Sequence, residues 1–272
     1  MTRCSTARAR SRSSDVFRVV IPARYGSTRL PGKALRELAG KPLVRWVYEC
    51  ACAAGAAEVL IATDDERIVR AAQAFAAPVV LTAASHASGT DRIAEVARAR
   101  GWAADEIVVN VQGDEPLMPA TLIRQVASLL AKHPQAHIAT LAAAIGSREE
   151  YLDPNAVKVV SDAAGRALYF SRAPVPWNRD GAATDLMSQR DFGGARRHIG
   201  LYAYRVRALL RLAQLPLGPL EAREKLEQLR ALEQGLEIQV ADALERPGPD
   251  VNTPADLERV AALIGSRADT SR

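Results

Sequence analysis

The feature that most constrains the fold is a regular alternation of short Val/Ile-rich runs with longer helical patterns. The first half has predicted strands at residues 17–23, 58–63, 78–82 and 106–112, and predicted helices at 42–54, 65–75, 88–100 and 119–131. The strand runs are apolar on both faces, which is typical of parallel strands covered by helices on both sides. The sequence therefore predicts an α/β fold with a mostly parallel sheet flanked by helices.

The second half of the chain has a different rhythm. Three strand runs, at residues 156–161, 166–171 and 197–204, are spaced as in antiparallel pairing. Between them, residues 174–194 are rich in Pro, Gly and Asp and predict a long loop, of the kind that is usually functional or mobile. We expect an antiparallel insertion at about residues 154–205.

Helical patterns return after this segment. One covers residues 224–234, and another begins with Thr253 as N-cap and Pro254 at the first helical position. No repeat or composition break suggests a linker. We expect a single domain over residues 16–265, followed by a disordered tail at 266–272.

The basic excess of the chain is mostly a property of its first residues. The net charge is +5, from 36 Lys and Arg against 31 Asp and Glu, and residues 1–15 carry about three of these units. We expect residues 1–15 to be a disordered basic tail; an organellar transit peptide has a similar Arg- and Ser-rich composition, and a nucleic-acid arm is a weaker alternative. The rest of the chain is nearly neutral, so we expect no nucleic-acid partner.

Two further classes of protein are excluded. No apolar stretch approaches the roughly 18 residues of a membrane span. The cysteines are Cys4, Cys50 and Cys52, an odd number, and the last two are too closely spaced for a zinc site on a helix. We expect a cytoplasmic protein with buried thiols and no membrane partner.

A basic loop directly follows the first predicted strand. The segment 22–33 holds Arg24, Arg29 and Lys33 together with two glycines and two hydroxyl residues. The carboxyl end of a parallel strand is where open α/β sheets bind ligands, and Arg24 and Lys33 can clamp a polyphosphate. Walker A spacing is absent, because five residues separate its glycines and Ala34 follows the lysine. The alternative is a solvated basic loop.

Further motifs follow this loop in order along the chain. They are Ser88–Arg92, Asn110–Pro116, Pro154–Val160, Tyr169–Arg172 with Pro176-Trp177, Arg197–Tyr202 and Glu227–Arg230. Together with the loop, they resemble the blocks of the 3-deoxy-manno-octulosonate (Kdo) cytidylyltransferase family over about residues 17–264. The loop is shared with CMP-sialate synthetases, and the later blocks narrow the resemblance to Kdo. It implies a Rossmann-like nucleotidyltransferase fold and a homodimer formed through the antiparallel segment.

The resemblance also implies a reaction. The anomeric hydroxyl of Kdo attacks the α-phosphate of CTP, which gives CMP-Kdo for lipopolysaccharide and pyrophosphate, with Mg²⁺ as cofactor. One alternative is a cytidylyltransferase for another sugar acid, 8-amino-Kdo or sialic acid. Another is a non-catalytic nucleotide-binding or RNA-binding protein. No residue is marked as a general base.

Site residues are implied by the same resemblance. Those for the nucleotide are Pro22, Ala23, Arg24, Lys33, Ser88, Gly89 and Gln112, with Arg24, Lys33 and Asp114 as the catalytic group. Those for the sugar acid are Arg29, Arg92, Arg172, His198, Tyr202, Glu227 and Gln228. The residue types suit an anionic, hydroxyl-rich substrate. A lone histidine is by default structural, and we leave His86, His133 and His137 in that class.

The metal site departs from the family pattern. Asp114 on its Gln-Gly-Asp turn is the implied Mg²⁺ ligand, although on spacing alone it is a turn-former. Where the family has V-D-T-P-x-D-L, this chain has Asn252, whose carbonyl can coordinate Mg²⁺ without adding charge. We hypothesise that Asp250, on the same face two residues earlier, supplies the charge. The alternative is that Asn252 suffices or only precedes the helix cap.

Overall fold

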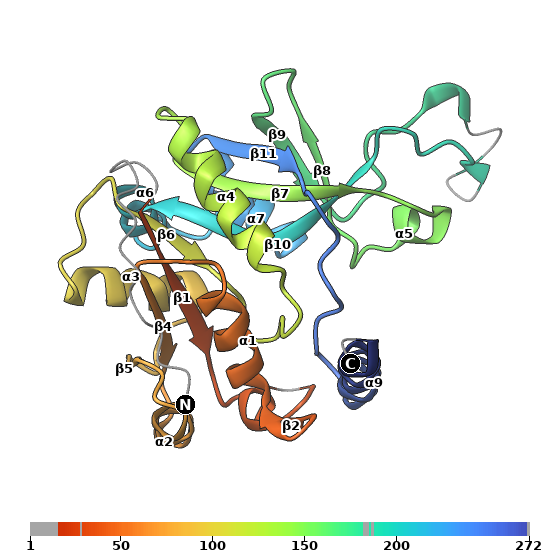
Figure 1. The fold of residues 1–272 in the computed structure, drawn as a ribbon. Coiled ribbons are helices and arrows are strands. Elements are labelled where there is room, and N and C mark those ends of the chain that lie inside the picture. Colours follow the sequence, from red (N-terminus) through yellow and green to blue (C-terminus); the bar gives the residue numbers. More distant parts are fainter. Residues whose placement is uncertain (1–15, 28, 182–184, 186–187, 271–272) are drawn as a thin grey trace.

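The computed structural model describes residues 16–27, 29–181, 185 and 188–270 (Figure 1). The expected tail at 1–15 lies outside the described residues. Within them, the strands of the main sheet follow the order β11-β7-β10-β6-β1-β4-β5. These are β1 (Phe17–Ala23), β4 (Glu58–Thr63), β5 (Val79–Leu81), β6 (Ile107–Asn110), β7 (Ile138–Ala144), β10 (Arg196–Arg205) and β11 (Ile238–Asp242).

Most neighbours in this sheet run parallel. β1 pairs in parallel with β4 and β6, β4 with β5, and β11 with β7, whereas β10 lies antiparallel between β6 and β7. The predicted mostly parallel sheet is therefore confirmed. Neither β7 nor β11 is among the predicted strands. The sequence of β7, IATLAAA, is dominated by alanine, which is depleted in strands, so its pairing is decided by the neighbouring strands rather than by local preference.

The predicted antiparallel segment is also confirmed. β8 (Lys158–Ser161) and β9 (Ala167–Ser171) form a hairpin, and β8 joins β10 through the pair Arg197 and Lys158. Gly165 has φ of +80° in the connecting turn, a value that favours glycine. β10 continues past the hairpin into the middle of the main sheet, so it belongs to both the insertion and the central sheet.

Helices cover both faces of the sheet (Figure 1). α1 (Leu43–Cys52), α2 (Glu66–Ala74) and α4 (Ala120–Lys132) pack on one face, and α3 (Gly89–Ala99), α6 (Val206–Leu212) and α8 (Gln228–Glu233) on the other. The strand β1 serves both cores, because Val19 and Ile21 pack on the first face and Val20 on the second. This two-sided burial is the physical reason for the continuous apolar strand runs.

Short elements complete the chain. They are η1 (Lys33–Leu35), β2 (Glu37–Leu38), β3 (Lys41–Pro42), α5 (Arg148–Leu152), η2 (Arg179–Gly181) and α7 (Pro219–Glu224). The helix predicted at 224–234 is wrong at its start, because Lys225 has φ of +54° and separates α7 from α8. No helix within the described ranges is long and apolar enough to cross a bilayer.

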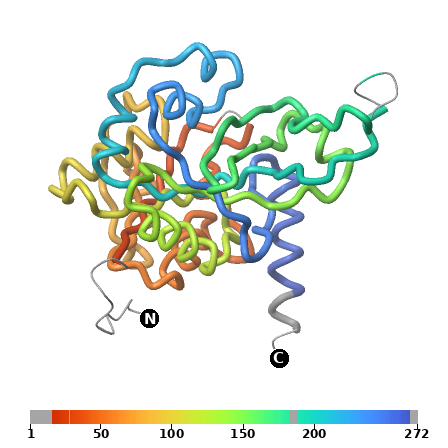
Figure 2. Tube along the Cα trace, turned by 90° about the horizontal axis from the view of Figure 1, so that it is seen from above, coloured from red at the N-terminus to blue at the C-terminus, as the bar shows by residue number. Residues whose placement is uncertain are grey.

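The last helix, α9 (Pro254–Thr270), projects from the rest of the body (Figure 2). Its predicted cap is present: the Asp256 amide donates to Thr253 Oγ1 at 3.2 Å, and the Thr253 amide donates to Asp256 Oδ2 at 2.9 Å. Val260 packs into a small core with Leu30, Leu38 and Leu43. The helix extends over residues 266–270, where the sequence analysis expects a tail, and residues 271–272 lie outside the described residues.

Candidate active site

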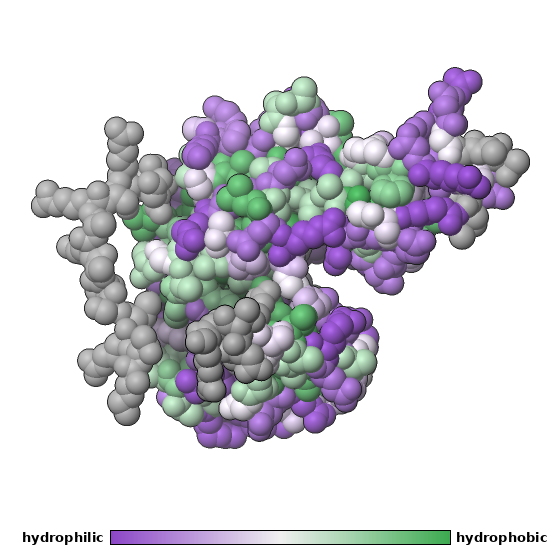
Figure 3. Space-filling model, turned by 45° about the vertical axis from the view of Figure 1, so that its right-hand side comes forward, coloured by the Kyte–Doolittle hydropathy of each residue, from purple (hydrophilic) through white to green (hydrophobic). Residues whose placement is uncertain are grey.

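A cavity of about 330 Å³ lies at the carboxyl ends of β1 and β6, beside the start of α3. It is lined by Pro22, Ala23, Arg24, Ser27, Arg29, Lys33, Ala34, His86, Ala87, Ser88, Gly89, Arg92, Gln112, Gly113, Asp114 and Asn252. Every residue expected at the nucleotide is among them, as are the two expected metal ligands and two of the expected sugar-acid arginines. In the space-filling view, the molecule is hollowed between the arm built by the antiparallel segment and the part that carries α9 (Figure 3).

The basic loop closes on itself after β1. The Gly32 amide donates to the Tyr25 carbonyl at 3.2 Å, and the Lys33 amide donates to the Leu30 carbonyl at 3.1 Å. Gly32 has φ of +66°, and an added Cβ would lie 3.2 Å from the Tyr25 ring, so both its conformation and its space favour glycine. This turn brings the side chain of Lys33 back to the cavity.

The Lys33 ammonium meets two oxygen acceptors from distant parts of the chain. Its Nζ donates to Asp114 Oδ2 at 2.7 Å and to Asn252 Oδ1 at 3.2 Å. The Val251 amide donates to the Asp114 carbonyl at 2.9 Å, which fixes Asn252 beside Asp114. Two hard oxygen donors thus converge on one cation position, and this geometry fits a divalent ion that displaces the ammonium group.

Asp250 lies on the far side of the Asn252 amide. Asn252 Nδ2 donates to Asp250 Oδ2, while its Oδ1 accepts from Arg29 Nη2 at 2.9 Å as well as from Lys33. The Asp250 carboxylate therefore orients the amide so that its carbonyl oxygen faces the basic loop. Within the part of the chain that the structure describes, no cluster of three His, Cys, Asp or Glu residues could hold a metal. Mg²⁺ commonly takes only one or two protein oxygens and completes its coordination with water and substrate phosphates.

Two glycines allow the wall opposite the basic loop to form. A Cβ on Gly113 would lie 2.8 Å from the Pro22 carbonyl oxygen, and one on Gly89 would lie 3.1 Å from Pro22 Cγ. The turns after β6 and before α3 can therefore both lie against Pro22, with Gln112 between them. Ser88 caps α3 in a reciprocal capping box with Asp91, as predicted.

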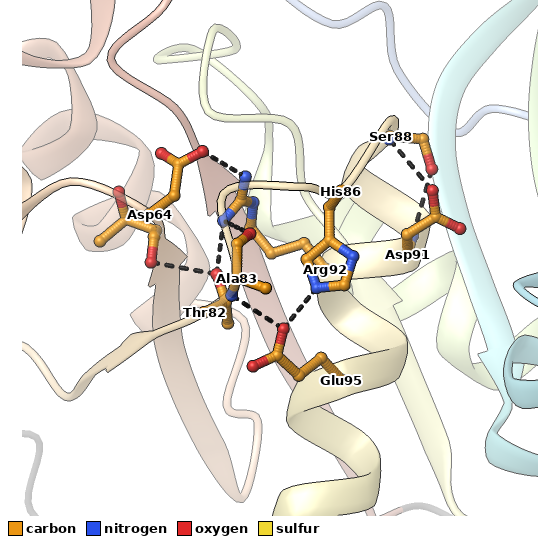
Figure 4. A network of polar contacts seen from close by, with 9 residues as sticks. Asp64, Thr82, Ala83, His86, Ser88, Asp91, Arg92 and Glu95 are labelled. Carbon is orange, nitrogen blue, oxygen red and sulfur yellow. Dashed lines mark hydrogen bonds and ion pairs between the residues drawn. The ribbon is translucent and has the colours of Figure 1, made fainter.

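Arg92 lines the cavity, but its charge is already paired. Its side chain is 4% exposed, and its Nη2 lies 2.7 Å from Oδ2 of Asp64, which directly follows β4. Its Nη1 donates to Thr82 Oγ1 (Figure 4). These contacts hold the segment before α3 against β4, so Arg92 positions the cavity wall in addition to facing the cavity. Asp64 is not among the predicted site residues.

The other expected sugar-acid residues lie outside the lining of this cavity. Glu227 lies next to it, because Thr90 Oγ1, one residue after Gly89, donates to Glu227 Oε2 at 2.6 Å. Burial raises the pKa of Glu227. Gln228 follows as the first residue of α8 and is buried. This bond joins the start of α8 to the first turn of α3. Glu227 therefore lies beside Ser88 and Gly89, which are expected at the nucleotide.

His198 and Tyr202 both lie on β10, and their side chains contact each other. Their ring centroids are 5.2 Å apart, and the His198 ring also meets Phe170 edge-on at 5.1 Å. Burial and the charge of Arg197 lower the pKa of His198 to about 3, so its imidazole is neutral. Thr140 Oγ1 donates to a backbone carbonyl and therefore accepts from His198 Nε2, 3.0 Å away. Nδ1 is left as a hydrogen-bond acceptor.

Arg172 is held by backbone carbonyls at the edge of the antiparallel segment. Its Nε donates to the Glu224 carbonyl at 2.7 Å, and its Nη1 donates to the Pro154 carbonyl at 2.8 Å. These bonds hold the hairpin against α7. In this conformation the guanidinium is engaged by protein oxygens, so a ligand would have to compete with them.

His86 and Glu115, two titratable residues, are also missing from the predicted set. His86 lines the cavity, and its Nε2 contacts Glu95 Oε2. Glu115 has a buried Oε2 with no hydrogen-bond partner among the described residues, and burial, then the charges of Asp114 and Asp250, raise its pKa to about 8. His86 lies just before the motif Ser88–Arg92, and Glu115 lies within the motif Asn110–Pro116. Residue type alone does not mark either of them as a site residue.

Comparison with known proteins connects this geometry to a function. A family model described as cytidylyltransferase matches residues 18–238. A protein named 3-deoxy-manno-octulosonate cytidylyltransferase from Cellvibrio japonicus (strain Ueda107) is 55% identical over 249 residues, which cover 91% of this chain and 98% of that protein. One with the same name from Pseudomonas syringae pv. syringae (strain B728a) is 56% identical over 248 residues, 91% of this chain and 98% of the relative.

A solved structure gives the same result in three dimensions. It is that of CMP:2-keto-3-deoxy-manno-octonic acid synthetase complexed with CTP. It matches this chain with a TM-score of 0.83 and 42% sequence identity, over 93% of this chain and 99% of the other. The likeness therefore extends over the sheet, the antiparallel segment and the cavity.

Proposed function

Because this chain belongs to the cytidylyltransferase family, we propose that it transfers CMP from CTP to the anomeric hydroxyl of Kdo, with release of pyrophosphate, for lipopolysaccharide synthesis. The single observation that carries the proposal is the cavity, which the basic loop, the Asp114 carboxylate and a wall with Ser88, Gly89 and Gln112 line together. Cations for the phosphates and a carboxylate that can hold a metal ion are what the transfer of a nucleotide from a triphosphate needs. The chain is accordingly an enzyme, a nucleotidyltransferase.

The basic loop would bind the triphosphate. Arg24 and Lys33 line one side of the cavity. Phosphoryl transfer requires mainly that the phosphates be positioned and that their charge be stabilised, which these cations supply through charge-assisted hydrogen bonds. Ser88, Gly89 and Gln112 line the opposite wall and would receive the cytidine, with Pro22 and Ala23 as its apolar floor.

The cofactor that we propose is Mg²⁺, held by Asp114 and Asn252. Their side-chain oxygens converge on the Lys33 ammonium, and oxygen donors are the ligands that Mg²⁺ prefers. When bound, the ion would neutralise charge on the triphosphate and lower the pKa of an oxygen nucleophile. Lys33 would then be released toward the phosphates. Asp250 would add negative charge close by and orient the Asn252 amide.

The sugar acid would lie between this cavity and β10. Arg29 and Arg92 reach it from the cavity side, whereas His198, Tyr202, Glu227, Gln228 and Arg172 approach from β10, α8 and the hairpin. A neutral imidazole, a phenol and a carboxylate suit sugar hydroxyls, and the arginines suit the sugar carboxylate. This set supports Kdo as the acceptor.

Pyrophosphate release from CTP in the presence of a panel of sugar acids tests the proposal. We expect release with Kdo to exceed release with 8-amino-Kdo or sialic acid by orders of magnitude in kcat/KM. Turnover that favours another sugar acid would correct the substrate. Nucleotide binding without turnover on any sugar acid would leave only the binding function.

We further propose that two copies of the chain associate through the antiparallel segment. Leu168 on β9 is 61% exposed and Trp177 in the following loop is 40% exposed, a pair of apolar side chains that a second copy could cover. Sedimentation velocity of the wild type and of Leu168→Lys would test this. A cytoplasmic location remains a prediction.

A further inference from the structure

His86 is a polar residue on the cavity wall that the proposed function leaves without a task. It precedes Ser88 and Gly89, the residues proposed for the cytidine, and lines the cavity with them. Its side chain is only 19% exposed. The imidazole of this half-buried side chain has two ring nitrogens, so one can bind a protein group while the other is left for a ligand.

Glu95 supplies the partner on the protein side. Its Oε2 contacts His86 Nε2 and also accepts from the Ala83 amide at 3.0 Å (Figure 4). Burial by itself would raise the pKa of Glu95, but the hydrogen bonds from Ala83 and His86 outweigh it, and the pKa is lowered. Glu95 is therefore an ionised acceptor that binds both ends of the segment 83–86.

A carboxylate at Nε2 decides what the other ring nitrogen can do. Because a carboxylate only accepts, the neutral imidazole must carry its proton on Nε2, which leaves a lone pair on Nδ1. No hydrogen bond from another described residue reaches Nδ1. With a neutral imidazole, the cavity wall thus presents an acceptor beside Ser88 and Gly89.

This acceptor matches one feature of a pyrimidine nucleotide. Cytosine carries an amino group at C4, which donates, whereas uracil carries a carbonyl oxygen there, which only accepts. We propose that His86 reads the 4-amino group of cytosine through Nδ1, and that Glu95 is the positioning residue that fixes its tautomer. This inference rests on the proposed function, because it assigns a specificity residue to the same nucleotide site.

Calorimetric titration with CTP and with UTP, in the presence of Mg²⁺ and without sugar acid, tests the inference. We expect the wild type to prefer CTP, and His86→Ala to lower the affinity for CTP about tenfold while leaving that for UTP unchanged. His86→Asn, whose Oδ1 can occupy the place of Nδ1, should keep most of the preference. Glu95→Gln, which can donate to Nε2 and reverse the tautomer, should reduce it.

His133→Ala is the matched control, because its ring bonds the Leu129 carbonyl on α4, away from the cavity. It should keep the wild-type ratio of affinities. An unchanged ratio in His86→Ala, or equal losses for both nucleotides, would overturn the role of His86 and leave the proposed function standing. A wild type that binds neither nucleotide would overturn both.

Discussion

Lys33 Nζ lies 2.7 Å from Asp114 Oδ2, although the two residues are 81 positions apart in the chain. Lys33 belongs to the basic loop after β1, and Asp114 to the turn after β6, the neighbouring strand. The pair therefore links the proposed phosphate-binding and metal-binding halves of the cavity. The two charges neutralise each other, so the proposed binding of CTP and Mg²⁺ would separate them.

The substitution Lys33→Met should weaken CTP binding by about tenfold to a hundredfold, because it removes a charge-assisted hydrogen bond to the triphosphate. Calorimetric titration with CTP measures the effect. Lys41→Met is a suitable control, since Lys41 pairs with Glu49 outside the cavity. An affinity equal to that of the wild type would mean that Lys33 does not contact the phosphates.

Asp250→Ala should raise the Mg²⁺ concentration needed for half-maximal activity several-fold, because it removes negative charge and releases the Asn252 amide. Asn252→Asp should lower that concentration, since it adds a charged oxygen ligand. Direct Mn²⁺ binding followed by electron paramagnetic resonance should change in the same directions. A metal dependence unaltered in Asp250→Ala would show that Asn252 suffices without it.

Gly113→Ala should disrupt the cavity wall, because its Cβ would lie 2.8 Å from the Pro22 carbonyl oxygen and one of the two turns must move. We expect a loss of about 1–3 kcal/mol in the free energy of unfolding and a marked loss of CTP affinity. In Gly265→Ala on α9, the added Cβ meets no atom within 4 Å, so this control should lower neither the free energy of unfolding nor the CTP affinity. Wild-type affinity in Gly113→Ala would argue against the close contact.

Stability should depend on pH through His198. The pKa is about 3 in the folded chain and about 6.5 in an unfolded one, so between these values the unfolded chain binds the additional proton. Stability must then fall as the pH drops below about 6.5. Between pH 7.5 and pH 5.5, the free energy of unfolding measured in urea should fall by about 1 kcal/mol less in His198→Asn than in the wild type. Equal losses would mean that His198 titrates normally.

Much of the fold follows from local pattern. The strand at residues 58–63 has the bounds that its apolar run predicts, and Thr253 and Asp256 form the expected cap. The errors occur where tertiary contacts override local preference. The alanine-rich β7 is a strand because two strands flank it, and Lys225 breaks a continuous helical pattern by adopting a left-handed conformation.

The site was predictable to the extent that it lies in contiguous motifs. The basic loop, Ser88-Gly89 and Gln112 could be found because each motif carries its own residues to the cavity. The pairing of Arg92 with Asp64 could not, since it depends on how α3 lies beside β4. The position of His86 was missed for a related reason, because its place on the cavity wall and its contact with Glu95 arise only in the folded chain.

The most direct test of the central claim is to identify the products that form from CTP, Kdo and Mg²⁺. Phosphorus NMR of the reaction should reveal a new phosphodiester resonance and pyrophosphate in equal amounts, and mass spectrometry should identify CMP-Kdo. Omission of Kdo should leave CTP intact. Cleavage of CTP without formation of a CMP-sugar, or no reaction at all under these conditions, would contradict the proposed transfer.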